Sequence, residues 1–133
     1  MVRGRTRFAA AALAAAVGAG AAAHGGGAQA APATTAAYKT KIVKMDDNYY
    51  SPAKLKIHKG QRVQWVWPND VGDTHDVKVR KAPKGAKKFT SPGYATGAKW
   101  PRPKGKVFKV KGTYSLYCTY HETEMTMTIK VVK

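Results

Sequence analysis

Apolar and polar residues alternate along most of the chain after residue 38, and this alternation predicts β-strands. In Lys54–His58, Leu55 and Ile57 share one face while cations occupy the other, as in a half-buried strand. The same period of two predicts further strands at Lys39–Val43, Gln61–Trp67, His75–Arg80, Lys106–Lys111, Thr113–Cys118 and Thr126–Val132. No stretch there has a sustained helical period, so we expect an all-β fold, a β-sandwich or barrel.

Turn residues separate these strands. Asp46–Asn48 and Lys59–Gly60 are short breaks of the kind that turns favour. The longest break is 81–103, which carries four prolines and three glycines. We expect this segment to be a loop.

The N-terminal segment has the features of a secretory signal peptide. Three arginines within the first seven residues precede the Ala-rich apolar run Phe8–Ala23, and Ala28-Gln29-Ala30 fits a small-x-small cleavage site. A retained membrane anchor is the alternative, but the run is short and weakly apolar for a membrane span. The prediction is a signal peptide at 1–30, a short flexible leader at 31–38 and one domain at 39–133, secreted or extracytoplasmic and without stable membrane insertion.

The chain is strongly basic, with 24 Lys and Arg against 7 Asp and Glu. Without the three arginines of the signal peptide, 21 basic residues face 7 acidic ones, a net charge of +14. Hydrophobic residues at 44% argue against a disordered basic tail. Such a charge attracts acidic redox proteins or an anionic polymer of the cell envelope, and the secretory signal excludes nucleic acid as the biological target.

One stretch near the C-terminus concentrates residues that bind soft metals. It holds the only cysteine, Cys118, followed by His121 and Met125. Thiolate, imidazole and thioether ligands together suit copper, whereas carboxylates and water suit magnesium or calcium. His75 is the candidate fourth ligand, because it opens a predicted strand on the same face as Val77. These residues predict a site for one copper ion.

Two features of the candidate site leave alternatives open. Met127 has the same strand parity as Met125 and competes with it as the thioether ligand. The shorter loop from His121 to Met125 favours Met125. A lone cysteine is most often a small buried hydrophobic residue, but ligation would explain an unpaired thiol in a secreted protein. His58 lies on an outward parity and is expected to be a solvated surface residue.

Several further segments stand in a fixed order around the candidate ligands: Tyr50-Ser51-Pro52, Lys59 to Trp65, Asn69 ahead of Thr74-His75-Asp76-Val77, and Gly112 to His121 followed by Met125. This order resembles that of small cupredoxins of the plastocyanin, pseudoazurin and amicyanin kind. The resemblance implies a Greek-key sandwich of about eight strands with a type 1 copper at one end. It places His75, Cys118 and His121 in the equatorial positions and Met125 in the axial one.

The resemblance has departures and one open role. Tyr120 stands where several family members have proline, and Glu122 and Glu124 make the ligand loop unusually acidic. Asp76 follows a ligand histidine at a place where the family has a polar side chain near the thiolate. The alternative for Asp76 is an exposed strand residue, and the sequence does not separate the two.

Three functions fit this sequence. The first is a secreted one-electron carrier with mononuclear copper, working as a monomer between redox partners. The second is a copper-binding or copper-delivery protein of the envelope, and the third is a non-redox basic module that binds anionic cell-surface polymer. An enzyme is not expected, because only His58, His75 and His121 remain after signal removal and two of them serve the mononuclear site.

Overall fold

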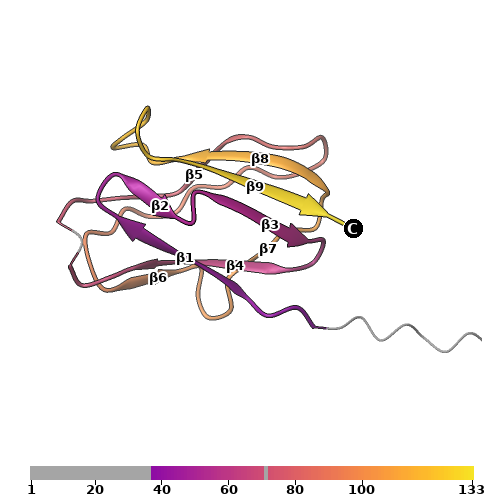
Figure 1. Cartoon of the computed structure of the whole chain (residues 1–133), viewed down its shortest axis with the longest axis horizontal. Coiled ribbons are helices and arrows are strands. Elements are labelled where there is room, and N and C mark those ends of the chain that lie inside the picture. The colour runs from indigo at the N-terminus through magenta and orange to yellow at the C-terminus, as the bar shows by residue number, and fades with distance from the viewer. Residues whose placement is uncertain (1–36, 71) are drawn as a thin grey trace, which may run out of the picture. The chain divides into compact units, whose positions relative to one another are not determined.

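A computed structural model describes residues 37–70 and 72–133. The predicted signal peptide and most of the leader lie outside these residues, so the domain boundaries stay predictions. The described residues form nine strands and no helix (Figure 1). The strands are β1 (Lys41–Asp46), β2 (Tyr49–Ser51), β3 (Lys54–His58), β4 (Arg62–Trp67), β5 (Lys78–Lys81), β6 (Ala98–Trp100), β7 (Lys106–Val107), β8 (Gly112–Tyr117) and β9 (Thr126–Val132).

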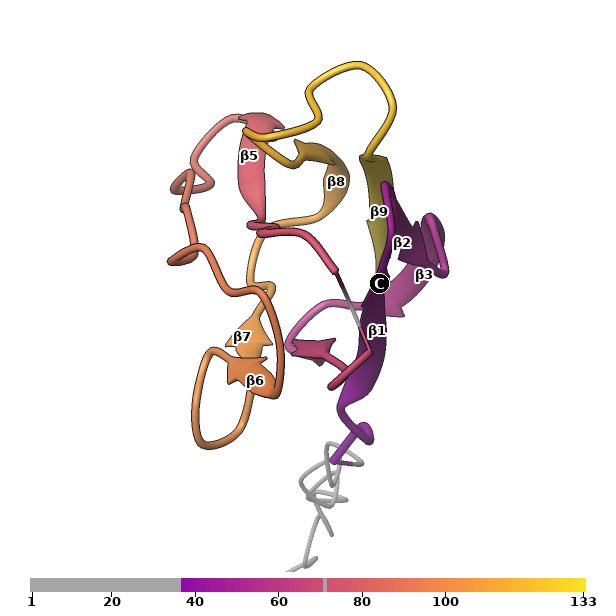
Figure 2. The ribbon, with the colours of Figure 1, turned by 90° about the vertical axis from the view of Figure 1, so that its left-hand side faces the viewer.

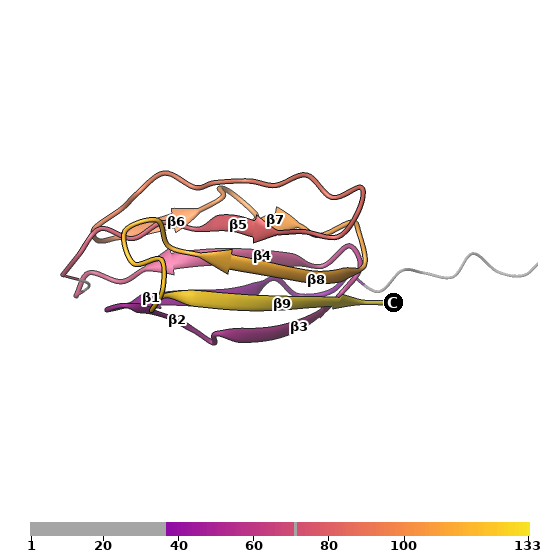
Figure 3. The same cartoon turned by 90° about the horizontal axis from the view of Figure 1, so that it is seen from above.

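The strands form two sheets that make a sandwich (Figure 3). One sheet has the order β2-β1-β4-β6, with β7 also paired to β4, and the other has the order β3-β9-β8-β5. The β1–β4 and β3–β9 pairs are parallel, and the other pairs are antiparallel. The predicted all-β sandwich is therefore confirmed, with nine strands described where about eight were expected.

Alternation along the strands builds the core between the sheets. In β4, Val63, Trp65 and Trp67 are buried, as their shared parity predicts. The inward residues of β9 are likewise buried, whereas Leu55 of β3 is only partly covered. Each inward residue is followed by one that faces outward, because side chains of a strand point to opposite sides in turn.

The strand predicted at Lys106–Lys111 is confined to Lys106–Val107, and two further predicted elements are corrected. The expected strand at His75–Arg80 begins only at Lys78, and His75 forms an isolated bridge to Tyr94 instead. The expected loop at 81–103 supplies that bridge and also contains β6, which pairs with β4. Pairing with distant strands, which a local pattern does not encode, decides both differences.

Several loops meet at one end of the sandwich, which we call the loop pole. It consists of the β1–β2 turn, residues 68–70 and 72–77, and the β8–β9 loop at 118–125. Figures 1 and 3 show these segments at the same end, and Figure 2 looks onto that end. Within the described residues no helix has the length and apolar character to cross a membrane.

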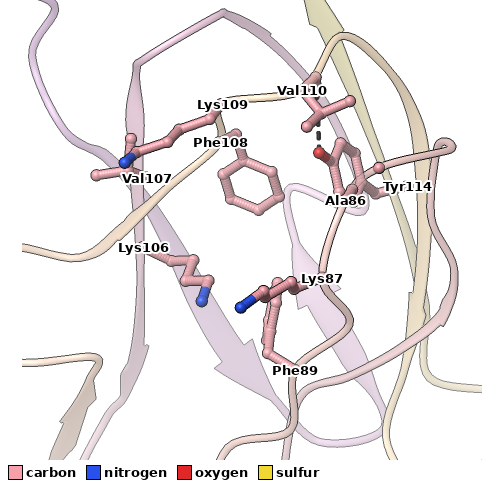
Figure 4. A pocket seen from close by; sticks show the side chains of 10 residues that line it. Ala86, Lys87, Phe89, Lys106, Val107, Phe108, Lys109, Val110 and Tyr114 are labelled. Atoms are coloured by element: carbon pink, nitrogen blue, oxygen red, sulfur yellow. Dashed lines mark hydrogen bonds between the residues drawn. The ribbon is translucent and has the colours of Figure 1, made fainter.

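A cavity of about 560 Å³ lies away from the loop pole. Its floor is aromatic, from Phe89, Phe108 and Tyr114, and the side chains of Lys87 and Lys106 reach over it (Figure 4). None of the candidate metal ligands lines this cavity. It is therefore separate from the candidate metal centre.

Candidate metal centre

The end of β8 brings the cysteine into the core. Tyr114 and Leu116 are buried on the inner face of β8, and Cys118 continues that face just beyond the strand. The backbone N–H of Cys118 still donates to the carbonyl of Met125 at 3.0 Å. The sulfur is therefore held on a paired segment of backbone, fully buried, and not on a free loop.

The loop after Cys118 folds back on itself through backbone hydrogen bonds. The N–H of His121 donates to the carbonyl of Cys118 at 3.3 Å, and the N–H of Met125 donates to the carbonyl of His121 at 3.0 Å. These bonds set the turn that returns His121 toward the cysteine. The imidazole of His121 is partly exposed, unlike the Cys118 side chain.

His75 reaches the same place from the segment between β4 and β5. Its N–H and carbonyl exchange hydrogen bonds with Tyr94, both at 3.0 Å. The indole Nε1 of Trp67 also donates to the His75 carbonyl at 3.0 Å. The histidine is fully buried although it belongs to no regular strand.

Three donor atoms converge at the loop pole. The Sγ of Cys118 lies 3.9 Å from Nδ1 of His75 and 3.8 Å from Nδ1 of His121. One donor atom from each of the three residues lies within 4.8 Å of the others. Bonds of about 2.3 Å to sulfur and about 2.0 Å to nitrogen, as at zinc, separate the two donors by about 3.7 Å when the angle at the metal is 120°. The donor spacing therefore fits a shared ion in a trigonal arrangement.

Burial shifts the pKa values of His75 and Cys118 in opposite directions, and both shifts favour the neutral side chain. It lowers the pKa of His75, and the neighbouring His121 lowers it further; the neutral imidazole is the form that binds a metal. Burial raises the pKa of the Cys118 thiol, although backbone N–H groups oppose this. A buried thiol without a cation stays protonated, and a coordinated metal removes its proton. The donor set is therefore suited to a soft cation.

A family model identifies the kind of protein that carries this donor set. Residues 36–132 match the model for copper-binding proteins of the plastocyanin/azurin family. The chain belongs to that family. It is a cupredoxin, and its cofactor is one copper ion of type 1. Comparison of the sequence with curated proteins gave no match.

Solved structures share the cupredoxin fold. A reduced amicyanin variant has 20% identity to this chain and a TM-score of 0.57. The match covers 70% of this chain and 82% of the amicyanin chain. A purple cupredoxin from Nitrosopumilus maritimus has 24% identity and a TM-score of 0.54, covering 69% of this chain and 99% of its own.

A copper-containing nitrite reductase from Thermus scotoductus also matches, with 24% identity and a TM-score of 0.58 over 71% of this chain. The match spans only 22% of the reductase. At such identities the three structures support the fold alone.

Asp76 is buried in this cupredoxin, which answers the question that the sequence left open. Its carboxylate accepts hydrogen bonds from the N–H of Thr119 at 2.7 Å and from the Thr119 hydroxyl at 2.6 Å. Its own backbone N–H donates to the Cys118 sulfur at 3.4 Å. Asp76 thus ties the His75 segment to the residue that follows the cysteine, and the exposed alternative is wrong.

Thr119 is the site residue that sequence reasoning missed. The motif around Cys118 gives no reason to select it, because its role depends on Asp76, 43 residues away. The strict alternation predicted for His75–Arg80 also put Asp76 on the outer face. The irregular backbone at 75–77, where three successive residues are buried, breaks that alternation.

The two methionines occupy different depths. Met127 pairs with Leu116 and Thr126 with Tyr117 in the β8–β9 ladder, and the Cys118–Met125 hydrogen bond continues the ladder by one residue. Directly opposed residues have their side chains close together on one face. Met125 therefore lies beside Cys118, and Met127 lies two residues further into the core.

Proposed function

We propose that this cupredoxin is a one-electron carrier in which His75, Cys118 and His121 bind copper in a trigonal plane and Met125 is the axial ligand. The observation that carries the proposal is the convergence of two imidazole nitrogens on one buried sulfur at 3.8 and 3.9 Å. Two histidines and a cysteine with a weak axial methionine are the donor set of blue-copper electron-transfer sites.

When bound, copper supplies the one-electron chemistry of the Cu(II)/Cu(I) couple. The chain's own residues hold the donors in place: the His75 backbone is bonded to Tyr94 and Trp67, and the ligand loop is bonded to itself. Donors that are held this firmly move little when the charge on the ion changes. A small rearrangement favours fast electron transfer.

The exposure of the four proposed ligands differs. His75, Cys118 and Met125 are fully buried, which keeps water away from the centre, and His121 alone among them reaches the surface. This burial favours a carrier over a copper-delivery protein, because delivery requires the ligands to become accessible. We propose the partly exposed edge of His121 as the point of electron exchange.

The axial role of Met125 rests on the ladder position described above. Met125 lies beside Cys118, whereas Met127 lies opposite Leu116 within β9. A weak axial bond tolerates a long distance. However, the Tyr117–Thr126 pair lies between Met127 and the Cys118–Met125 pair along the ladder. The arrangement supports Met125 as the ligand and Met127 as core.

We further propose an extracytoplasmic monomer that is not an enzyme. His58 is exposed and bonded to the Lys133 carbonyl, away from the two candidate ligand histidines. Among the described residues this leaves no histidine for a second copper centre. The N-terminal pattern supports secretion, and the net charge supports acidic redox partners or an anionic envelope polymer.

The test is a comparison of visible absorption spectra. Copper-loaded protein should show an intense visible band from thiolate-to-copper charge transfer, and Cys118→Ser should lose it while keeping the sandwich. Circular dichroism checks the fold, and Met127→Leu is the control that should keep the band. A colourless copper complex of the native protein would contradict the proposal.

Retention of copper on reduction distinguishes a carrier from a delivery protein. A carrier should be reduced and reoxidised reversibly with its copper in place, in the presence of a Cu(I) chelator. Transfer of Cu(I) to the chelator on reduction would favour delivery.

A further inference from the structure

Acidic residues are confined to one end of the molecule. The seven fall in three groups: Asp46 at the end of β1 with Asp47 in the β1–β2 turn, Asp70, Asp73 and Asp76 after β4, and Glu122 and Glu124 in the β8–β9 loop. These segments make up the loop pole (Figures 1 and 3). The 21 Lys and Arg beyond residue 36 extend over the rest of the domain, so its charge is strongly polarised.

The outer face of the β3-β9-β8-β5 sheet carries only cations and neutral residues. We call the following six exposed residues the cationic face: Lys54, Lys56, Lys78, Arg80, Lys81 and Lys130. Between them the outward residues are mainly hydroxyl-bearing, such as Thr113, Ser115 and Thr128. Ammonium groups and hydroxyls side by side are the donors that phosphate and sulfate oxygens accept from.

The register of the strands brings like charges together on this face. Lys56 is directly opposite Lys130 in the parallel β3–β9 pair. In the next row, Lys54 pairs with Thr128, Thr128 with Ser115, and Ser115 with Lys81. Like charges directly opposite each other destabilise a sheet. A bound polyanion would remove that repulsion.

The shape of the face distinguishes between anionic partners. A shallow cavity of about 350 Å³ lies between β3 and β9, lined by Lys54, Lys56 and Lys130 with Leu55 and Thr128. A polymer chain can enter such a hollow, but a bilayer surface cannot. Membrane attachment also uses exposed apolar side chains. Of the four exposed large apolar residues of the described chain, Tyr38 is stacked on His58 at the end of β3, and Ile42, Tyr49 and Tyr120 lie elsewhere.

We propose that the cationic face is a binding site for a linear polyanion carrying phosphate or similar groups. Its charge, its hydroxyl donors and the hollow between the lysines complement such a chain. Binding there leaves the loop pole free, because the pole lies at the end of the sandwich and carries the opposite charge. The interaction is independent of copper.

The test measures the binding of long-chain inorganic polyphosphate to the copper-loaded protein at several salt concentrations. Removing three cations with Lys54→Gln, Lys56→Gln and Lys130→Gln should weaken binding at least tenfold. It should also lower the slope of log affinity against log salt by about 2, since each phosphate contact contributes about 0.7 to that slope. The matched control removes the same charge elsewhere, with Lys84→Gln, Lys87→Gln and Lys109→Gln, and should change affinity less than threefold.

Several outcomes would overturn the proposal. Equal losses in both triple variants would show that only net charge matters. Absence of polyphosphate binding at low salt would exclude the site, and binding to vesicles with anionic lipid but not to polyphosphate would assign the face to a bilayer. The visible copper band, measured on each variant, separates these failures from a failure of the metal centre.

Discussion

The buried carboxylate of Asp76 accepts two hydrogen bonds, and both come from a single residue. Both come from Thr119, one from its backbone and one from its hydroxyl. The backbone bond brings the residue after Cys118 to the residue after His75. Thr119 and Asp76 therefore join the two chain segments that carry the sulfur and one imidazole.

Replacing Thr119 with valine should destabilise the copper-free protein. The variant keeps the shape of the side chain but removes one hydrogen bond to a buried carboxylate, which costs about 2 kcal/mol. Thr119→Ser retains the hydroxyl and should cost less than about 1 kcal/mol. Denaturant unfolding of the two variants measures the difference, and equal losses would mean that the hydroxyl does not contribute.

The axial position can be tested with two substitutions of the same kind. Met125→Gln should keep the copper and shift the reduction potential, because an axial ligand tunes that potential. Met127→Gln places a polar amide in the core beside Leu116 and should lower stability with the potential unchanged. Voltammetry and unfolding on both variants provide the readouts, and a potential shift confined to Met127→Gln would reverse the assignment.

At the scale of elements, strand β4 and the irregular segment 75–77 together position His75. β4 ends in Trp67, whose indole donates to the His75 carbonyl at 3.0 Å. The nearby Trp65 belongs to the same strand, but its Nε1 is buried without a hydrogen-bond partner among the described residues. The two tryptophans are therefore a matched pair that differs in one hydrogen bond.

Trp67→Phe should lower the free energy of unfolding by about 1 kcal/mol more than Trp65→Phe. Both variants lose similar apolar contact, and only the first loses a hydrogen bond, a net contribution of about 1 kcal/mol. Trp67→Phe should also weaken copper binding, since the His75 segment has no strand of its own to hold it. Denaturation and competition with a copper chelator measure the two effects; a larger loss for Trp65→Phe would contradict this view.

For the molecule as a whole, net charge and local charge differ in sign. The domain is strongly positive, yet the proposed copper end carries every acidic residue. At an ionic strength of about 0.1 M, charges beyond about 10 Å are largely screened. A partner that contacts the loop pole is therefore affected mainly by the acidic groups there, and less by the distant lysines.

Glu122→Gln with Glu124→Gln should slow electron exchange with a small cationic metal complex about twofold at an ionic strength of about 0.1 M. A unit charge at about 8 Å contributes a few tenths of a kcal/mol after screening, so two such charges change a rate about twofold. Exchange with an anionic complex should speed up by a similar factor. Stopped-flow kinetics measure both, and Thr113→Lys with Thr128→Lys adds the same charge on the cationic face as a control. Equal effects of the two double variants would show that net charge dominates.

The sequence alone predicted the fold class and the copper donors because both depend on local patterns. Alternation in β4, β8 and β9 identifies buried residues one strand at a time. The soft donors Cys118 and His121 are only three residues apart, and their chemistry indicates copper without any knowledge of their surroundings. The confirmed parts of the prediction are the all-β sandwich, the cupredoxin family and the copper cofactor; the ligand roles of individual residues stay predictions.

The tertiary structure decided what depends on residues far apart in the chain. The bonding of Asp76 to Thr119, the pairing of β6 with β4 and the depth of Met125 relative to Met127 each require a partner that local alternation cannot specify. The same holds for charge, since the sequence counts acids and lysines but only the folded chain gathers the acids at the loop pole. Periodicity acts between neighbours in sequence, whereas pairing, depth and surface potential arise from neighbours in space.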